Sequence, residues 1–116
     1  MKNNKVYMMK FSKIYECLVS KAERKGRTKK EVNEIIYWLT GYKEEDINNV
    51  IEKQMEYGDF FRNAPELNEK RFLIKGIVCG VKVEEIEDPL MRDIRYLDKL
   101  IDKLAKGKSM ENILRK

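Results

Sequence analysis

The residues best suited to bind an anion gather near the N-terminus of this 116-residue chain. Six cationic side chains fall within ten positions: Lys21, Arg24, Lys25, Arg27, Lys29 and Lys30. Lysine and arginine attract phosphates by charge, and both can donate hydrogen bonds to phosphate oxygens. The cluster therefore predicts a surface that binds an anionic macromolecule, with nucleic acid as the favoured partner.

The spacing of three other residues predicts that this cluster lies on a helix-turn-helix-like pair. Ala22, Gly26 and Val32 stand where that motif has a small residue, a turn glycine and an apolar residue, which together let two helices cross closely. The first turn of the second helix, with Asn33 after it, would then face phosphates and base edges. Arg27 departs from the motif, which has an apolar residue at that position.

Charge is unevenly distributed along the chain. Residues 1–30 hold ten Lys and Arg against two Glu, a net charge of +8. Residues 31–69 hold three basic against ten acidic residues, giving −7, and residues 70–116 hold twelve against eight, giving +4. An anionic partner, a homodimer with complementary charges, or pairing within the chain would each fit this distribution. Solvated helix faces of differing sign are the simpler explanation.

The composition argues against most catalytic sites. The chain has no histidine, so Ser-His and Cys-His nucleophile pairs cannot form within it, and two cysteines are too few for a zinc site. Four carboxylates could hold a divalent cation: Glu84, Glu85, Glu87 and Asp88. Charges at the start of a helix explain these acids more simply. We therefore expect a non-enzymatic binding protein without catalytic residues, metal or cofactor.

The two cysteines and the N-terminus bear on the cellular compartment. Cys17 and Cys79 lie in apolar stretches far apart in the sequence, as expected for reduced thiols in the cytoplasm. Cys79 is expected to be buried and structural, because apolar neighbours near a helix end raise the pKa of a thiol. The first residues lack the apolar core of a secretion signal, and no stretch is long enough to span a membrane. A membrane partner is therefore not expected.

Helices must position the basic cluster. From Ser12, apolar residues recur every three or four positions, and the helix is predicted to stop at Gly26. Thr28 and Glu31 form a capping-box pattern that opens a second helix ending at Gly41. Because so few residues separate the two helices, we expect them to pack as a tight pair.

Further glycines and caps divide the rest of the chain. A third helix is predicted from about Lys43 to Met55 and stopped by Gly58, followed by a single turn that buries Phe60 and Phe61. The last elements are predicted as a long helix opened by Asp88 and Pro89, ended by Gly107, and a short terminal helix over 109–116 capped by Ser109. Residues 1–10 are expected to form a flexible arm.

Two apolar surfaces could serve a protein partner. The stripe from Leu90 to Leu104 has a spacing that would suit packing on the chain's own core or, as the alternative, the seam of a homodimer. Tyr37, Trp38 and Tyr42 could form a stacking surface, although closure of the core by Trp38 is favoured.

The stretch "IKGIVCGVKVEEIEDP", residues 74–89, allows several structures. Its alternating apolar residues would suit a β-hairpin, but a lone hairpin among helices would be marginal, so a helix from Asn68 to Gly80 is favoured. Gly76, Gly80 and Ile86 repeat the helix-turn-helix spacing, but carboxylates on the second helix would repel DNA. The apolar residues between the glycines exclude a phosphate-binding loop.

Several motifs together resemble one bacterial family. These are "KAERKGRTKKEV", "WLTGY", "FFRNAP", "IKGIVCGVKVEEIEDPLM" and "IRYLDKLIDKLAKGKSMENILR". From about Tyr7 to Arg115 the chain is similar to the family named domain of unknown function 2200. The resemblance implies a single-domain cytoplasmic bacterial protein, with no assigned activity or functional residues.

The sequence thus predicts an all-α fold, a single compact domain over residues 1–116 with five or six short helices. A helix-turn-helix-like pair near the N-terminus would carry the basic cluster. The predicted function is binding of an anionic partner, and the alternative is a protein-interaction module or homodimer.

Overall fold

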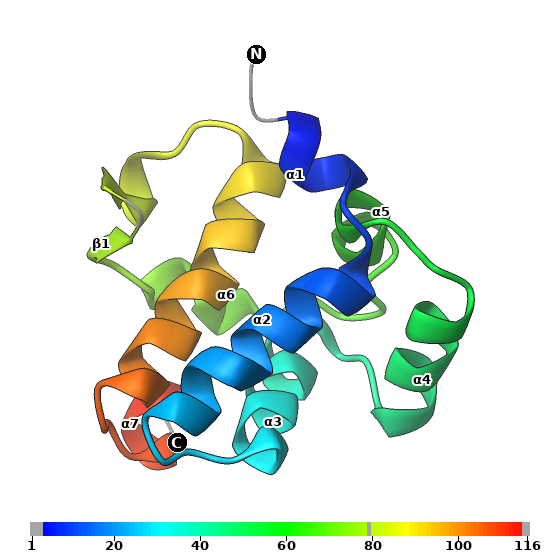
Figure 1. Cartoon of the computed structure of the whole chain (residues 1–116). Helices are drawn as coiled ribbons and strands as arrows, with labels where there is room; N and C mark the ends of the chain where they lie inside the picture. The colour runs from blue at the N-terminus through cyan, green and yellow to red at the C-terminus, as the bar shows by residue number, and fades with distance from the viewer. Residues whose placement is uncertain (1–3, 79, 115–116) are drawn as a thin grey trace.

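Helices form most of the molecule. The computed structural model describes residues 4–78 and 80–114, and within them the chain forms seven α-helices (Figure 1). They are α1 (Asn4–Met8), α2 (Phe11–Arg24), α3 (Lys29–Thr40), α4 (Glu44–Glu52), α5 (Tyr57–Arg62), α6 (Pro89–Ala105) and α7 (Met110–Leu114). A Cα radius of gyration of 13.2 Å fits one compact domain. The predicted all-α fold is confirmed, with more helices than the five or six expected.

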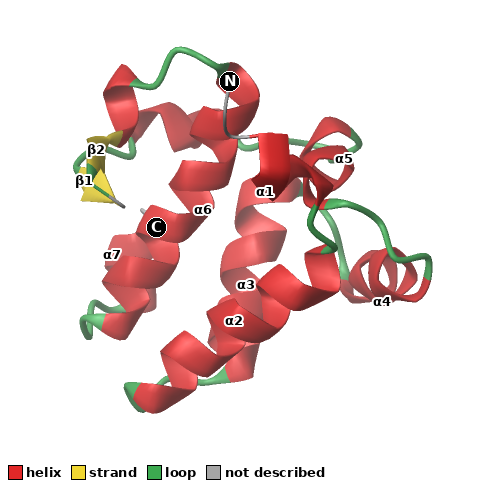
Figure 2. Ribbon diagram, turned by 45° about the horizontal axis from the view of Figure 1, so that its top comes forward, coloured by secondary structure: helices red, strands yellow, loops and turns green. Residues whose placement is uncertain are grey.

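The long helix α6 is the element on which the others pack. It contacts α2, α3, α5 and α7, and Figure 2 shows α6 beside α7 and the β-strands. Ile94, Leu97, Ile101 and Leu104 of its apolar stripe are at most 1% exposed. The stripe is thus buried in the chain's own core, and a homodimer would need another surface.

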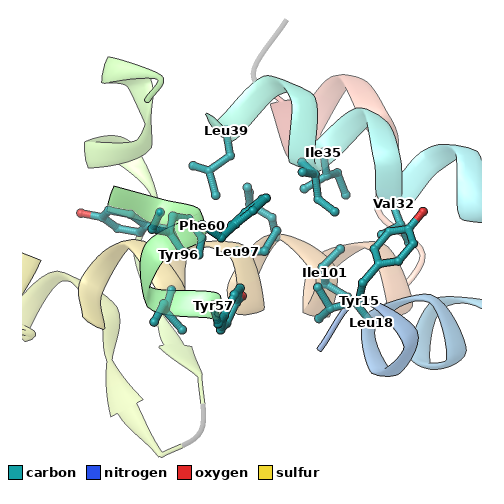
Figure 3. Close-up of a cluster of buried hydrophobic side chains, with 14 of the residues drawn as sticks. Tyr15, Leu18, Val32, Ile35, Leu39, Tyr57, Phe60, Tyr96, Leu97 and Ile101 are labelled. Atoms are coloured by element: carbon teal, nitrogen blue, oxygen red, sulfur yellow. The ribbon is translucent and has the colours of Figure 1, made fainter. Parts of the chain in front are cut away.

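A group of aromatic rings joins the N-terminal half to this core. The ring of Phe60 in α5 stacks on Phe11 of α2 at 4.1 Å between centroids and on Tyr42 at 4.6 Å. The Tyr42 hydroxyl donates a hydrogen bond to the Phe60 carbonyl oxygen at 2.7 Å. Figure 3 shows Phe60 in one cluster with Leu39 and Leu97. The prediction that Phe60 and Phe61 are buried is confirmed.

A short β-hairpin occupies the segment for which a helix was favoured, so that prediction is wrong. Strands β1 (Ile77–Val78) and β2 (Val81–Lys82) pair antiparallel, and Ile77 lies opposite Lys82. Gly76 and Gly80 have φ angles of +115° and +80°, which a continuing right-handed helix does not allow. Val78 is buried in the core cluster, and β1 contacts α6.

Contacts with the rest of the fold stabilise this hairpin. Lys99 of α6 donates a hydrogen bond to the Ile77 carbonyl oxygen at 3.1 Å, and the Gly76 amide donates to the Glu84 carboxylate at 3.0 Å. A short 3-10 helix, η1 (Glu69–Leu73), precedes the strands, and another, η2 (Val83–Glu85), follows them. Asn68 caps η1, as predicted for the element that it opens, but this element is a short 3-10 helix and not an α-helix that runs to Gly80. Cys79 lies outside the described residues.

The N-terminal segment and Gly58 also differ from prediction. Residues 4–8 of the expected flexible arm form α1, and the Tyr7 hydroxyl donates a hydrogen bond to the Asp88 carboxylate at 2.7 Å. Gly58 lies inside α5 and does not stop α4. A Cβ at this position would lie 3.0 Å from the Cβ of Tyr7. The glycine thus permits close packing of α1 on α5, and α4 ends at Glu52.

The predicted starts of the two C-terminal helices are confirmed. The Asp88 side chain accepts a hydrogen bond from the Leu90 amide at 3.0 Å, and Pro89 opens α6. Ser109 accepts a hydrogen bond from the Asn112 amide at 3.2 Å, which starts the short helix α7. These caps satisfy backbone groups that a helix cannot pair internally.

Candidate nucleic-acid interface

Helices α2 and α3 form the close pair predicted from Ala22, Gly26 and Val32. Ala22 and Val32 are fully buried, and Gly26 has a φ of +80° with no other atom near the position of a Cβ. The Arg27 amide returns to the Ala22 carbonyl oxygen at 2.9 Å, which ends α2. The small residue and the turn glycine thus bring the start of α3 close to the end of α2.

A capping box fixes the start of α3, as its sequence predicts. Thr28 accepts a hydrogen bond from the Glu31 amide at 3.1 Å, and the Glu31 carboxylate accepts one from the Thr28 amide at 3.0 Å. Lys29 and Lys30 are therefore held on the first turn of α3, where both side chains are exposed.

Arg27 differs from the other predicted cations because its guanidinium makes four hydrogen bonds within the protein. It donates to both oxygens of the Glu31 carboxylate, at 3.2 and 2.9 Å, and to the carbonyl oxygens of Leu104 and Lys108, at 3.1 and 2.8 Å. The Arg27 hydrogen bond lowers the pKa of Glu31 to about 2. Arg27 thus joins the α2–α3 turn to the end of α6 instead of facing a partner.

Lys21 is also paired. Its ammonium lies 3.6 Å from the Asp102 carboxylate of α6, which Lys106 contacts at 3.1 Å. The Lys21 side chain remains 43% exposed, so its charge is only partly neutralised by this surface contact.

Four of the six predicted cations remain exposed: Arg24, Lys25, Lys29 and Lys30. Within the part of the chain that the structure describes, none of them forms an ion pair. Lys29 lies over the Tyr15 ring, 5.8 Å from its centroid. We call these four residues the basic turn. They lie at one end of the molecule, where α2 ends and α3 begins (Figure 1).

The loop between α6 and α7 adds cations that sequence reasoning did not include. The contacts of Arg27 with Leu104 and Lys108 place this loop against the basic turn, although 77 and 81 residues separate the partners. Lys106 and Lys108 are both exposed there. The lysines on either side of Gly107 were a signal of local charge, but their position beside Arg27 depends on tertiary contacts.

A shallow hollow lies along α3 beside the basic turn. Its volume is about 490 Å³, and its lining residues are Lys29, Lys30, Asn33, Glu34, Tyr37 and Glu44. The Asn33 side-chain oxygen accepts a hydrogen bond from the Tyr15 hydroxyl, which leaves its amide group to face a partner. Glu34 and Glu44 also line the hollow, so an anion would bind beside the two lysines and not at these carboxylates.

The other candidate residues are placed apart from this surface or have structural roles. Trp38 is half-buried against the core and Tyr42 is buried, in agreement with the favoured prediction for the aromatic group. Cys17 is a free and exposed thiol. The second helix-turn-helix spacing, at Gly76, Gly80 and Ile86, falls in the β-hairpin and its flanking turns, so it does not form that motif.

The acidic residues 84–88 stabilise the local backbone. Glu84 accepts from the Gly76 amide, Glu85 lies 4.0 Å from the Lys82 ammonium, and Asp88 caps α6. Among residues 4–78 and 80–114, no three Cys, Asp or Glu side chains converge in a group that could hold a metal ion. None of the helices in these ranges has the length and apolar character needed to cross a membrane.

Comparison with known proteins places the chain in a family without an assigned activity. No curated protein matches it. The crystal structure of the uncharacterized protein SP1917 is similar, with 47% sequence identity and a TM-score of 0.92, over 97% of this chain and 93% of that chain. The family model described as "Uncharacterized protein conserved in bacteria (DUF2200)" matches residues 5–115. The chain therefore belongs to the DUF2200 family, as its sequence motifs indicated.

Proposed function

We propose that this protein binds nucleic acid through the basic turn formed by Arg24, Lys25, Lys29 and Lys30. The observation that carries the proposal is the exposure of these four cations within seven residues, without an ion pair to neutralise any of them in the described chain. Lys108 extends the same positive surface across the α6–α7 loop, whereas Lys106 is paired with Asp102.

The chemistry of this surface suits phosphates better than base edges. Its charged groups are exposed where α2 ends and α3 begins, and they can contact successive phosphates without a fixed base sequence. Asn33 and Tyr37 line the adjoining hollow, where they could contact sugars or an unpaired base. We therefore expect binding that depends weakly on sequence and strongly on salt.

Fluorescence anisotropy with labelled 20-nucleotide DNA and RNA, single- and double-stranded, tests the proposal across a salt series. If all four cations contact the phosphates of a duplex, the slope of log K against log salt should be about −3.6. Replacing all four with glutamine should make the slope shallower by about 3.6 and strongly weaken binding at low salt.

A matched variant tests whether binding depends on the basic turn itself or only on the net charge of the protein. Replacing Lys5, Lys10, Lys13 and Lys43 with glutamine removes the same four charges from other exposed positions. This control should retain most of the affinity. Loss of binding in both variants to the same degree, or no binding of any of the four nucleic acids at low salt, would contradict the proposal.

We also propose a cytoplasmic location. The exposed free thiol of Cys17 fits a reducing compartment, where it is not drawn into disulfide exchange. Fractionation of a bacterial cell that expresses the protein should recover it with the cytoplasmic proteins, and recovery from the cell surface would contradict this location.

A second candidate function is self-association through the apolar surface of η1 and the hairpin. Phe72, Leu73, Ile77 and Val81 are 44–59% exposed and fall within ten residues. Exposed apolar residues so close together are typical of interaction sites. This surface replaces the α6 stripe, which is buried, as the candidate for a homodimer.

Light scattering over a range of protein concentrations tests this second function. A dimer that Phe72→Ser together with Ile77→Ser converts to monomer would support it. A monomer at every concentration would exclude the homodimer.

A further inference from the structure

A second hollow on α3 lies where the end of this helix meets the segment that leads into η1. Its volume is about 520 Å³, within the range of small-molecule sites, and its lining residues include Tyr37, Trp38, Glu66, Glu69 and Lys70. It shares Tyr37 with the hollow beside the basic turn, but its other lining residues come from the end of α3 and from residues 66–70. The second hollow therefore presents a different chemistry from the proposed nucleic-acid interface.

Backbone contacts hold the two walls of this hollow together. The Glu66 amide donates to the Thr40 carbonyl oxygen at 3.0 Å, and the Asn68 amide donates to the Leu39 carbonyl oxygen at 2.9 Å. A Cβ at Gly41 would lie 2.8 Å from the Glu66 nitrogen, so a larger residue there would clash with the segment. Because the fold fixes both walls, a guest would not have to order them on binding.

One wall of the hollow is aromatic. Tyr37 and Trp38 are half-buried, and their backbone lies within α3, so their exposed area belongs mainly to the side chains. The faces of tyrosine and tryptophan rings attract cations, and tryptophan does so most strongly. This wall therefore suits a positively charged group that carries apolar substituents.

The other wall is acidic. Glu66 and Glu69 are exposed, and within residues 4–78 and 80–114 neither side chain forms an ion pair. Lys70 also lines the hollow, so two carboxylates stand against one ammonium group, a net charge of −1. These carboxylates would repel an anion and attract a cation that rests on the aromatic wall.

From the fixed walls, the aromatic side chains and the exposed carboxylates, we infer that this hollow binds a small organic cation, such as a protonated or quaternary amine. Tyr37 and Trp38 contact the apolar groups around the charged nitrogen, and Glu66 and Glu69 balance its charge. The inference does not depend on nucleic-acid binding, because the basic turn contributes no group to this contact.

Two probes of matched shape test whether the hollow requires a positive charge. Choline carries a quaternary nitrogen where neohexyl alcohol, its neutral isostere, carries a carbon atom. Each is titrated into the full-length protein while the indole N–H NMR signal of Trp38, the only tryptophan, is followed. Choline should shift this signal in a saturable manner and bind about tenfold more tightly than the alcohol. The inference is overturned if choline gives no saturable shift, or if the alcohol binds equally well.

Matched double variants test whether the acidic wall supplies this preference. Glu66→Gln with Glu69→Gln should lower the ratio of the two affinities about threefold, while the aromatic wall preserves the rest. Glu45→Gln with Glu52→Gln removes two charges from exposed positions of α4 and should leave the ratio unchanged. Equal effects of the two double variants, or no effect of either, would contradict a cation site at this hollow.

Discussion

Arg27 donates hydrogen bonds to three partners at once: the Glu31 carboxylate and the carbonyl oxygens of Leu104 and Lys108. Leu104 lies in the last turn of α6, where a cation is favoured by the helix dipole, and Lys108 lies in the loop that follows this helix. The side chain is only 17% exposed. The apolar residue that a helix-turn-helix motif has here is thus replaced by a cation that reaches the last helices.

We expect Arg27→Met to destabilise the protein by about 2 kcal/mol, because Glu31 and the carbonyl oxygens of Leu104 and Lys108 lose their charged donor. Urea unfolding followed by circular dichroism measures this change. Arg24→Met removes the same charge from an exposed position and should change stability by less than about 0.5 kcal/mol. Equal effects of the two variants would show that Arg27 acts through net charge alone.

The pKa of Glu31 predicts how acid affects the contact between Glu31 and Arg27. Its pKa in the folded protein is about 2, below the value of about 4.3 that an unfolded glutamate has. The contact therefore stabilises the fold fully above about pH 4.3, and the stabilisation is lost as the pH falls towards 2. Glu31→Gln should lower the melting temperature at pH 7 but make little difference at pH 2. A deficit that persists undiminished at pH 2 would argue against the ionised pair.

At the scale of elements, the sequence predicted best where caps and periodicity agree. Thr28 with Glu31 and Asp88 with Pro89 define the starts of α3 and α6, because these signals act within one helical turn. The hairpin was missed because its stability depends on distant residues: Lys99 pairs with the Ile77 carbonyl oxygen, 22 residues away. Local propensity could not decide between helix and strand there.

The sign of the stability change in Gly76→Ala distinguishes the predicted helix from the observed hairpin. Within a helix from Asn68 to Gly80, alanine would stabilise the protein by about 1 kcal/mol. In the hairpin, φ is +115° and a Cβ would lie 3.0 Å from the Lys99 side chain, so we expect destabilisation by about 1–2 kcal/mol. Thermal unfolding measures the difference. Ile77→Thr, at an exposed strand position, serves as the control and should change stability by less than about 0.5 kcal/mol.

At the scale of the whole molecule, tertiary contacts decide which cations remain available to a partner. The sequence indicated six, but Lys21 pairs with Asp102 and Arg27 pairs with Glu31. The α6–α7 loop brings Lys108 to the same end. The hydrogen bond between Arg27 and the Lys108 carbonyl oxygen joins distant positions and has no signal in the local sequence. The extent of the positive surface could therefore not be predicted. The acidic residues of α4 pair with none of the four residues of the basic turn in the described chain.

The aromatic stack around Phe60 predicts that the molecule unfolds as one unit. Phe60 contacts Phe11 of α2 and Tyr42 after α3, and its helix packs on α6, so no large part of the core is independent of it. Urea transitions followed by circular dichroism and by the fluorescence of Trp38, the only tryptophan, should coincide.

Phe60→Leu should shift both transitions together by about 1–2 kcal/mol, since it loosens a packed site without removing its apolar volume entirely. Phe72→Leu, at a position 51% exposed, should shift them far less. Separation of the two probes in Phe60→Leu would instead divide the fold into a part around α3 and a part around α5, joined only weakly by this ring.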